Sequence, residues 1–369
     1  VTTMPDFNAT DNAYMARALE LAERGCYGAH PNPMVGCVIV RGGEIVGEGW
    51  HARAGAPHAE INALAEAGEA ARDADVYVSL EPCAHHGKTP PCADALVDAG
   101  VSRVIVAMQD PFPEVAGQGI RKLRDAGIDV YCGLLEERAE ELNRGYLSRV
   151  RRGRPWLTLK IAASVDGCVA MANGESQWIT GPEARADVQR YRARSGAVLS
   201  GIGTVLADDP SFTVRDESLG DTARQPLRVI LDSRLRMPLS ASMLDQPGDT
   251  LVFCADDANR STLEKTGAEV AVSAGADDRV DLLAVLEELG RREINAVFAE
   301  AGPGIAGSLV ERGLVDELVI YQAPHIMGSE TAPMFRTPRW TRLADRRELQ
   351  VLERQVIGDD LRITARLRD

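Results

Sequence analysis

The feature that most constrains the fold is a regular alternation of short apolar runs with helical patterns. Runs such as "VGCVIV", "DVYVSL" and "VSRVIVAM" have the length and β-branched content of strands, and "PHAEINALAEAGEAA" has helical spacing. The alternation is interrupted by the basic, Gly- and Pro-containing segment "VRRGRP" at residues 150–155 and then restarts. Because 369 residues are too many for one ordinary core, we predict two α/β domains, residues 1–149 and 150–369.

Turn and cap residues locate several elements of the first domain. Asp11 is expected to cap the first helix, and "RGGE" to turn a hairpin between "VGCVIV" and "IVGEGW". Gly100 and Gly127 are expected to end two later helices. The predicted order is therefore β-β-α-β-α-β-α-β after the first helix, as in a layered α/β domain.

Composition and charge exclude several classes of function. No stretch approaches the roughly 18 apolar residues of a membrane helix. The first ten residues carry no secretory pattern, and seven scattered cysteines suit a reducing compartment, so we expect a cytoplasmic protein. The net charge is −14, and residues 1–150 hold 22 acidic and 13 basic side chains. Neither half resembles a nucleic-acid binder, so an anionic substrate must be held by a few local bases.

The segment "LEPCAHHGKTPPCADAL", residues 80–96, carries the strongest chemical signal. Cys83 and Cys92 offer two thiolates, and "HAE" places His58 and Glu60 at the start of a helix. A catalytic zinc site needs three N or S ligands and leaves one position open for water. We predict that His58, Cys83 and Cys92 bind Zn²⁺, which activates water for attack on a ring carbon bearing an amine, and that Glu60 transfers the proton.

Simpler interpretations of these residues compete with zinc binding. The two cysteines could form a disulfide, which a reducing compartment disfavours, or could be inert core thiols. His85 and His86 lie close to Cys83 in sequence, but adjacent residues on a turn rarely point at one ion, so we interpret them as loop residues. A purely structural zinc module would normally have four protein ligands, and only three are well placed here.

These motifs resemble a known family. "HAE", "EPC" and a second cysteine are similar to the cytidine and nucleotide deaminase superfamily, although there the cysteines are usually two residues apart. The longer "EPCAHHGKTPPC", with "HPNPMVGCVIV" upstream, closely resembles the RibD family of bacterial riboflavin biosynthesis. The likeness continues through "MQDPFPEVAGQGI", "SVDGCVAMANGESQWIT", "TVLADDP" and "AEAGPGIAGSL". It implies a cytidine-deaminase-like three-layer αβα domain followed by a dihydrofolate-reductase-like α/β domain.

The resemblance implies an activity for each domain. The first would deaminate 2,5-diamino-6-ribosylamino-4(3H)-pyrimidinone 5′-phosphate hydrolytically. The second would use NADPH to reduce 5-amino-6-(5-phosphoribosylamino)uracil to the ribitylamino product. In the first domain, Lys88 resembles the phosphate-binding lysine of the family, and Asn32 and His51 match positions that contact the ring or sugar. The residues alone also allow a turn-forming Asn32 and a surface His51.

In the second domain, a glycine motif follows the strand "INAVFAE". Gly302, Gly304 and Gly307 spell G-x-G-x-x-G at the start of a helix, where backbone amides favour a pyrophosphate. The motif comes too late in its domain for a Rossmann fold, and the resemblance assigns it to the NADPH phosphates instead. The positions that match dinucleotide contacts of the family are Ala162, Trp178, Thr204, Asp208, Ser233, Gly302, Pro303, Gly304 and Gly307.

Further positions match the family's contacts to the phosphoribosylamino-uracil. Arg192 and Arg215 could offer forked donors to its 5′-phosphate, although a solvated helix face is the alternative for Arg192 and a core position for Trp178. Lys160 ends an apolar strand and is either a strand-end lysine or a proton donor or orienting group near the sugar. The substrate set is Lys160, Ser176, Arg192, Ser211, Arg215 and Glu300.

The sequence thus predicts a bifunctional zinc aminohydrolase and NADPH-dependent oxidoreductase. Its partners are small phosphoribosyl pyrimidines, with no nucleic acid and no membrane, and the resemblance suggests a homo-oligomer, a dimer or tetramer. The alternative is a nucleic-acid or nucleoside deaminase with an unrelated appended domain. The acidic first half and the long spacing between the cysteines disfavour it.

Overall fold

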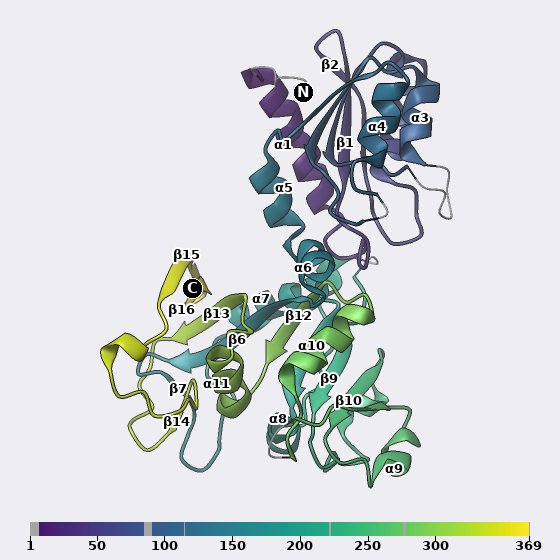
Figure 1. Ribbon diagram of the computed structural model, residues 1–369. Coiled ribbons are helices and arrows are strands. Elements are labelled where there is room, and N and C mark those ends of the chain that lie inside the picture. The colour runs from purple at the N-terminus through teal and green to yellow at the C-terminus, as the bar shows by residue number, and fades with distance from the viewer. Residues whose placement is uncertain (1–6, 85–90, 114, 221–222, 276–277, 369) are drawn as a thin grey trace. The chain divides into compact units, whose positions relative to one another are not determined.

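The computed structural model describes residues 7–84, 91–113, 115–220, 223–275 and 278–368 (Figure 1). Its backbone contacts divide the chain into two compact units, Val1–Arg152 and Gly153–Asp369. The segment predicted to break the chain is partly helical, because helix α6 (Arg144–Arg152) continues through its first three residues. Arginines in the last turn of α6 favour this helical end, since cations there interact well with the helix dipole.

The first unit is built on one five-stranded sheet with the strand order β2-β1-β3-β4-β5. Strand β1 pairs antiparallel with β2 and β3, whereas β3, β4 and β5 run parallel. Gly42 and Gly43 form the β1–β2 turn with positive φ values, as the "RGGE" pattern predicts. The elements are α1 (Ala9–Glu23), β1 (Gly36–Arg41), β2 (Glu44–Trp50), α2 (Ala59–Ala67), the 3₁₀ helix η1 (Gly68–Ala71), β3 (Asp75–Leu80), α3 (Cys92–Ala99), β4 (Arg103–Met108), α4 (Gln118–Asp125), β5 (Asp129–Cys132), α5 (Glu136–Leu142) and α6.

Helices cover both faces of this sheet and make it the middle of three layers. One core joins Val38 and Ile105 of the sheet to α1, α5 and α6. The other joins Ile39 and Val104 to α2, α3 and α4. Neighbouring strand residues point to opposite faces, so each strand contributes to both cores. The predicted three-layer αβα architecture is confirmed.

The first helix is capped differently from the prediction. Asn8, and not Asp11, is the N-cap, and its side chain accepts hydrogen bonds from the amides of Thr10 and Asp11. The Asp11 carboxylate accepts from the Asn8 amide in return, so the two residues form a reciprocal capping box. Asp11 is 5% exposed, and its carboxylate also accepts a hydrogen bond from the Tyr77 hydroxyl.

Glycines allow helices to lie directly on the strands of the first unit. A Cβ at Gly36 of β1 would lie 2.0 Å from the Ala18 carbonyl oxygen of α1. At Gly49 of β2 it would lie 2.2 Å from the Ala59 carbonyl oxygen of α2. Backbone atoms cannot move aside as a flexible side chain can, so these positions require glycine.

The second unit contains a nine-stranded mixed sheet in the order β11-β10-β9-β8-β12-β6-β13-β16-β15. The first seven strands in this order, from β11 through β13, run parallel. The hairpin β15–β16 adds two antiparallel strands beside β13. The elements are β6 (Trp156–Ser164), β7 (Cys168–Ala170), α7 (Pro182–Arg194), β8 (Ala197–Gly201), α8 (Ile202–Asp208), η2 (Glu217–Leu219), β9 (Leu227–Leu231), η3 (Ser242–Asp245), β10 (Thr250–Cys254), α9 (Arg260–Glu264), β11 (Glu269–Val272), α10 (Leu282–Arg291), β12 (Ala296–Glu300), α11 (Pro303–Glu311), β13 (Glu317–Ala323), β14 (Ala332–Pro333), η5 (Leu343–Asp345), β15 (Leu349–Ile357) and β16 (Asp360–Leu367).

Helices also cover both faces of the parallel part of this sheet. Helices α10 and α11 pack on the face that carries Leu199 and Val297. Residues of α7 and α8 pack on the opposite face, against Phe298 and Val198 respectively. This confirms an α/β fold for the second unit. Among the described residues, no helix combines the length and apolar character needed to cross a membrane.

The close approach at Gly36 leads to a prediction about stability. Gly36→Ala should lower the free energy of unfolding by about 1–3 kcal/mol, because the added methyl group forces α1 away from β1. Urea unfolding followed by circular dichroism measures the change. Gly203→Ala is the control, since a Cβ there meets nothing within 4 Å. Equal stability of Gly36→Ala and the unmodified chain would contradict this packing.

Candidate functional site

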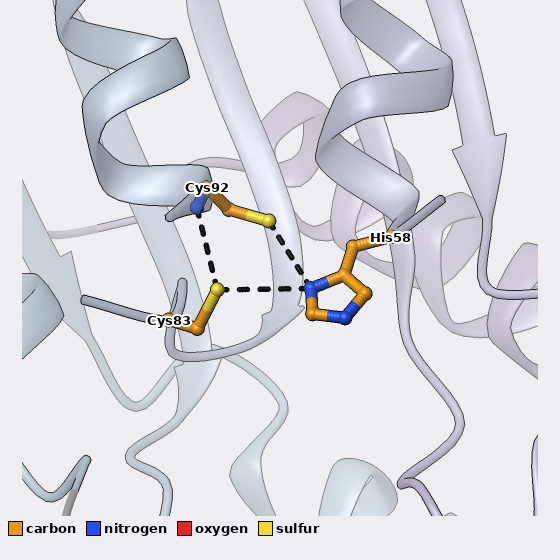
Figure 2. Close-up of side chains that lie close together, drawn as sticks. All are labelled: His58, Cys83 and Cys92. Atoms are coloured by element: carbon orange, nitrogen blue, oxygen red, sulfur yellow. Dashed lines mark hydrogen bonds between the residues drawn. The ribbon is translucent and has the colours of Figure 1, made fainter. Parts of the chain in front are cut away.

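Three metal-ligating side chains of the first unit converge from separate elements. His58 is the N-cap residue of α2, Cys92 is the first residue of α3, and Cys83 lies in the turn after β3 (Figure 2). Strand β3 and the helices α2 and α3 belong to one packed core, which fixes the three positions relative to one another. The sequence therefore brings together residues 58, 83 and 92 through the fold and not through local spacing.

The distances between these side chains suit one shared ion. His58 Nδ1 lies 3.7 Å from Cys83 Sγ and 3.3 Å from Cys92 Sγ. All three donor atoms lie within 4.8 Å of one another. One imidazole nitrogen and two sulfurs form a donor set that zinc prefers, and three protein ligands leave a fourth tetrahedral position for water. The residues thus fit a catalytic zinc ion.

Hydrogen bonds stabilise a thiolate at Cys83. The pKa of its thiol is lowered to about 4, first by a hydrogen bond from Cys92 Sγ and further by bonds from His58 and the Cys92 amide. That amide lies 3.3 Å from Cys83 Sγ at the beginning of α3, where backbone donors are unpaired. The pKa of Cys92 is raised because it shares its proton with Cys83. A bound cation would favour the thiolate form of both residues.

Glu60 lies beside this group in the first turn of α2. It is 3% exposed and its carboxyl group contacts the Cys92 thiol. Burial raises the pKa of Glu60 to about 7, and the nearby Cys83 adds to the increase. A carboxyl group with this pKa can accept and release a proton near neutrality, as a proton-transfer group must.

Asn32 and His51 form the neighbouring wall of the site. Asn32 Nδ2 lies 3.0 Å from His51 Nε2, and the His51 ring packs edge-on against His58, with centroids 5.3 Å apart. His51 Nδ1 lies 3.1 Å from the Pro57 carbonyl oxygen, so Nδ1 carries the proton and Nε2 accepts from the amide of Asn32. Burial lowers the pKa of His51, which favours its neutral form. His51 is 2% exposed, so it is not the surface histidine considered above.

Glu81 supports the turn that carries Cys83, a role that the sequence analysis missed. Its buried carboxylate accepts hydrogen bonds from the amides of Gly117, Gly119 and Ile120, at 2.9–3.2 Å. It therefore fixes the beginning of α4 against the segment that follows β3. An acidic residue at the end of an apolar strand, in "LEPC", is the signal that could have drawn attention to it. Lys88, His85 and His86 lie outside the described residues.

A separate cavity of about 980 Å³ lies within the second unit. Gly201 of β8 and Glu300 of β12 are the last residues of parallel strands, where ligands bind in open α/β sheets. Lys160 lines the same cavity, but it does not end its strand as the sequence predicted, because β6 continues to Ser164. The cavity brings together most of the predicted reductase residues, namely Lys160, Ala162, Ser176, Trp178, Arg192, Thr204, Asp208, Ser211, Arg215, Glu300, Gly302, Pro303 and Gly304.

Arg192 and Glu300 form a buried ion pair at this cavity. Arg192 donates from Nε and Nη2 to the two Glu300 oxygens, at 2.6 and 3.1 Å, and from Nη1 to the Thr213 carbonyl oxygen. Both side chains are 11% exposed, so Arg192 does not lie on a solvated helix face. Its forked donors, predicted for a phosphate, are thus occupied by a carboxylate in this structure.

Lys160 is the third charged group of this cluster. It pairs with Glu300 across neighbouring strands β6 and β12. Burial lowers the pKa of Lys160, and the nearby Arg192 lowers it further while Glu300 opposes the change. For Glu300, burial alone would raise the pKa, but Arg192 and Lys160 hold it below its ordinary value.

The glycine motif divides into two parts. Gly302 is the N-cap of α11, and a Cβ at Gly304 would meet nothing within 4 Å, so both leave room for a ligand. A Cβ at Gly307 would lie 1.9 Å from the Arg336 carbonyl oxygen, which gives this glycine a packing role. Gly307 and Ser233 are not among the described residues that line the cavity. Ser233 instead lies 3.3 Å from the Val280 amide through its hydroxyl oxygen.

Three further pairs of side chains line the cavity: two are joined by hydrogen bonds, and in the third an arginine lies over an aromatic ring. Ser176 donates to Asp208 at 3.0 Å, and Arg215 Nη1 donates to the Ser211 hydroxyl at 3.3 Å. Trp178 is 69% exposed and is therefore not a core residue. The Arg185 guanidinium lies 4.6 Å from the centre of the Trp178 ring. The sequence analysis did not predict Arg185 as a cavity residue. Its position two helical turns before Arg192, on the same side of α7, is the signal that could have indicated it.

Comparisons with family models agree with the two units. A model described as the cytidine and deoxycytidylate deaminase zinc-binding region matches residues 8–108. A model described as the RibD C-terminal domain matches residues 155–362. The first match contains His58, Glu60, Cys83 and Cys92, and the second contains the cavity.

Similar proteins cover both units together. The riboflavin biosynthesis protein RibD of Escherichia coli is 48% identical over 95% of this chain and 98% of its own length. That of Haemophilus influenzae is 47% identical over 98% of both chains. A solved structure of Acinetobacter baumannii RibD superposes with a TM-score of 0.92 at 43% identity, covering 98% of this chain and 99% of its own.

The converging donors predict about one zinc ion per chain. Cys83→Ser should reduce the zinc content to near zero, because only two strong ligands remain, and should destabilise the first unit. Metal analysis of the purified variant measures this. Cys132→Ser, which changes a half-buried thiol of the same unit, should keep its zinc. A Cys83→Ser variant with full zinc content would show that Cys83 is not a ligand.

Proposed function

This chain belongs to the RibD family and is a bifunctional deaminase and reductase of riboflavin biosynthesis that uses zinc and NADPH, and we propose which residues perform each step. We assign deamination to the first unit, with His58, Cys83 and Cys92 as zinc ligands and Glu60 as the proton-transfer residue. The observation that carries this assignment is the convergence of the three donor atoms beside a buried glutamate.

Zinc supplies a nucleophile by lowering the pKa of a bound water molecule. Glu60 would accept one proton from the attacking water and pass it to the pyrimidine ring nitrogen as the C–O bond forms. It would then carry the second proton, from the added hydroxyl group, to the amino group, which leaves as ammonia when the C–N bond breaks. Burial beside Cys92 supports this role, because a carboxyl group with a pKa near 7 can be protonated and deprotonated in one catalytic cycle. His58 is the N-cap of the helix whose first turn holds Glu60, so α2 sets the position of Glu60 relative to this ligand.

We propose 2,5-diamino-6-ribosylamino-4(3H)-pyrimidinone 5′-phosphate as the substrate of this site. The bifunctional enzyme of Thermotoga maritima, 30% identical with a TM-score of 0.85, is described as a diaminohydroxyphosphoribosylaminopyrimidine deaminase and 5-amino-6-(5-phosphoribosylamino)uracil reductase. Asn32 and neutral His51 can present an amide and an imidazole to the ring or the sugar. Lys88 is proposed for the phosphate on sequence grounds alone.

The cavity of the second unit is proposed as the reductase site. Gly302, Pro303 and Gly304 open helix α11, whose unpaired backbone amides suit the phosphates of NADPH. Ala162, Trp178, Thr204 and Asp208 would complete the cofactor site along the cavity wall. We propose that Gly307 and Ser233 also belong to the cofactor site. Gly307 would support it indirectly, since it packs α11 against the backbone of residue 336.

The cluster of Lys160, Arg192 and Glu300 is proposed to hold the sugar of 5-amino-6-(5-phosphoribosylamino)uracil. NADPH supplies the hydride that converts the ribosylamine, in its ring-opened form, to the ribityl product. Glu300 is kept ionised by Arg192 and can accept hydrogen bonds from sugar hydroxyls. Lys160 is positioned to orient the sugar or to donate a proton. Ser176, Ser211 and Arg215 are the proposed contacts to the phosphoribosyl group.

The cysteines and an exposed edge strand bear on where the protein works and how it assembles. We infer a cytoplasmic location, because the zinc thiolates and seven free cysteines suit a reducing compartment. We infer a homo-oligomer, a dimer or tetramer, in which the exposed edge strand β15 could pair with a second copy. Sedimentation of the purified chain tests the second inference.

A variant of Glu60 can test whether deamination and reduction take place at separate sites. Glu60→Gln should keep its zinc and lose at least ~100-fold in deamination, because the amide cannot accept a proton. Reduction of the deaminated intermediate by NADPH should continue at the normal rate. Ammonia release and NADPH absorbance measure the two reactions. Loss of both activities, with zinc retained, would contradict the assignment of the steps to separate sites.

The proposed phosphate contact of Arg215 gives a second test. Arg215→Gln should raise the KM of the reductase for its phosphorylated substrate about tenfold or more, since a charge-assisted hydrogen bond is lost. The KM for NADPH should be unchanged. Arg224→Gln, at an exposed arginine outside the cavity lining, is the matched control. An unchanged KM in Arg215→Gln would remove this residue from the substrate site.

A further inference from the structure

We infer that Asn143 is a positioning residue of the deaminase, because it fixes the loop that carries Asn32. Asn143 lies 109 residues after Met34 in the sequence and meets it in the fold. The Met34 amide donates to Asn143 Oδ1 at 2.8 Å, and Asn143 Nδ2 donates to the Met34 carbonyl oxygen at 2.9 Å. One side-chain amide thus pairs with both polar groups of one loop residue, as a neighbouring strand would.

The backbone around Asn143 makes it a rigid support. Asn143 ends helix α5, where its amide donates to the Ala139 carbonyl oxygen at 3.1 Å. Its own carbonyl oxygen accepts from the Leu147 amide of α6 at 2.9 Å. Asn143 is 2% exposed, so water does not compete for its side chain. The position of the loop at Met34 is therefore set by the junction of two helices.

The loop in turn places Asn32 beside the metal ligands. Asn32, two residues before Met34, contacts His51, and the His51 ring packs against His58. On the other side of Met34, the Val35 carbonyl oxygen accepts from the His51 amide at 2.9 Å. A shift of Met34 would thus move Asn32 and its contact to His51 together. This inference rests on the proposed role of Asn32 in substrate binding.

The chemistry of the asparagine side chain is specific to this task. The backbone of one residue presents one donor and one acceptor, and only an amide side chain offers the complementary pair at this length. Aspartate would keep the bond from the Met34 amide but place an acceptor against the Met34 carbonyl oxygen. Alanine would leave both groups of Met34 without this partner. The two substitutions should therefore have graded effects.

The test compares substrate binding with local order in the loop. Asn143→Ala should raise the KM for the diaminopyrimidine phosphate about tenfold with a smaller change in kcat, and Asn143→Asp should raise it less. The zinc content and the reductase activity should not change. Hydrogen exchange of residues 30–36, followed by mass spectrometry, should be at least about tenfold faster in Asn143→Ala, since the Met34 amide loses its acceptor.

Two further variants separate the possible outcomes. Tyr77→Phe removes a buried hydrogen bond to Asp11 in the same unit, so it should lower stability without changing the KM or the exchange of the loop. Asn32→Ala should raise the KM as Asn143→Ala does. If only Asn32→Ala raises the KM, the positioning role is wrong. If neither does, the proposed substrate role of Asn32 is wrong, and faster loop exchange in Asn143→Ala would leave Asn143 with a structural role only.

Discussion

The first unit depends on bringing one imidazole and two sulfurs to a common point inside a packed domain. Such groups are costly to bury unless each is paired or bound to a metal. The fold reduces this cost by using positions where backbone donors are free. His58 and Cys92 lie at the beginnings of α2 and α3, and the amide of Cys92 points at Cys83. The packing of both helices on β3 therefore serves to hold these donors together.

The second unit also buries an ionisable group, and there the neighbouring charged side chains stabilise it. Glu300 lies in the cavity wall with a lowered pKa, because Arg192 donates one hydrogen bond to each of its two oxygens and Lys160 lies on the next strand. A buried pair of this kind is strongly destabilised when one partner is removed. In this structure the forked donors of Arg192 therefore face a buried carboxylate and help to keep it ionised.

The sequence predicts the alternating elements and the α/β organisation well, and the structure brings together the three residues predicted as metal donors. Each of these features has a local pattern. His58, Cys83 and Cys92 are chemically unusual residues in a short motif, and Gly42 and Gly43 mark their turn directly. Other features depend on distant contacts. Asp11 has the composition of a helix cap, but Asn8 takes that place while Asp11 is drawn to Tyr77. The partner of Arg192 lies 108 residues away, and Asn143 has no motif at all. The hairpin β15–β16 was not predicted either, since β15 is almost wholly exposed and lacks an inward-facing apolar row.

The glycine contacts of the first unit also limit how this enzyme can be engineered. At Gly36, Gly47 and Gly49 the two surfaces meet through main-chain atoms, so repacking a neighbouring side chain cannot make room for a larger residue. Directed evolution of this domain would find almost no tolerated exchanges along these lines of contact. Libraries aimed at higher heat resistance are better directed at solvent-facing helix residues away from both sites, where an added atom meets only water.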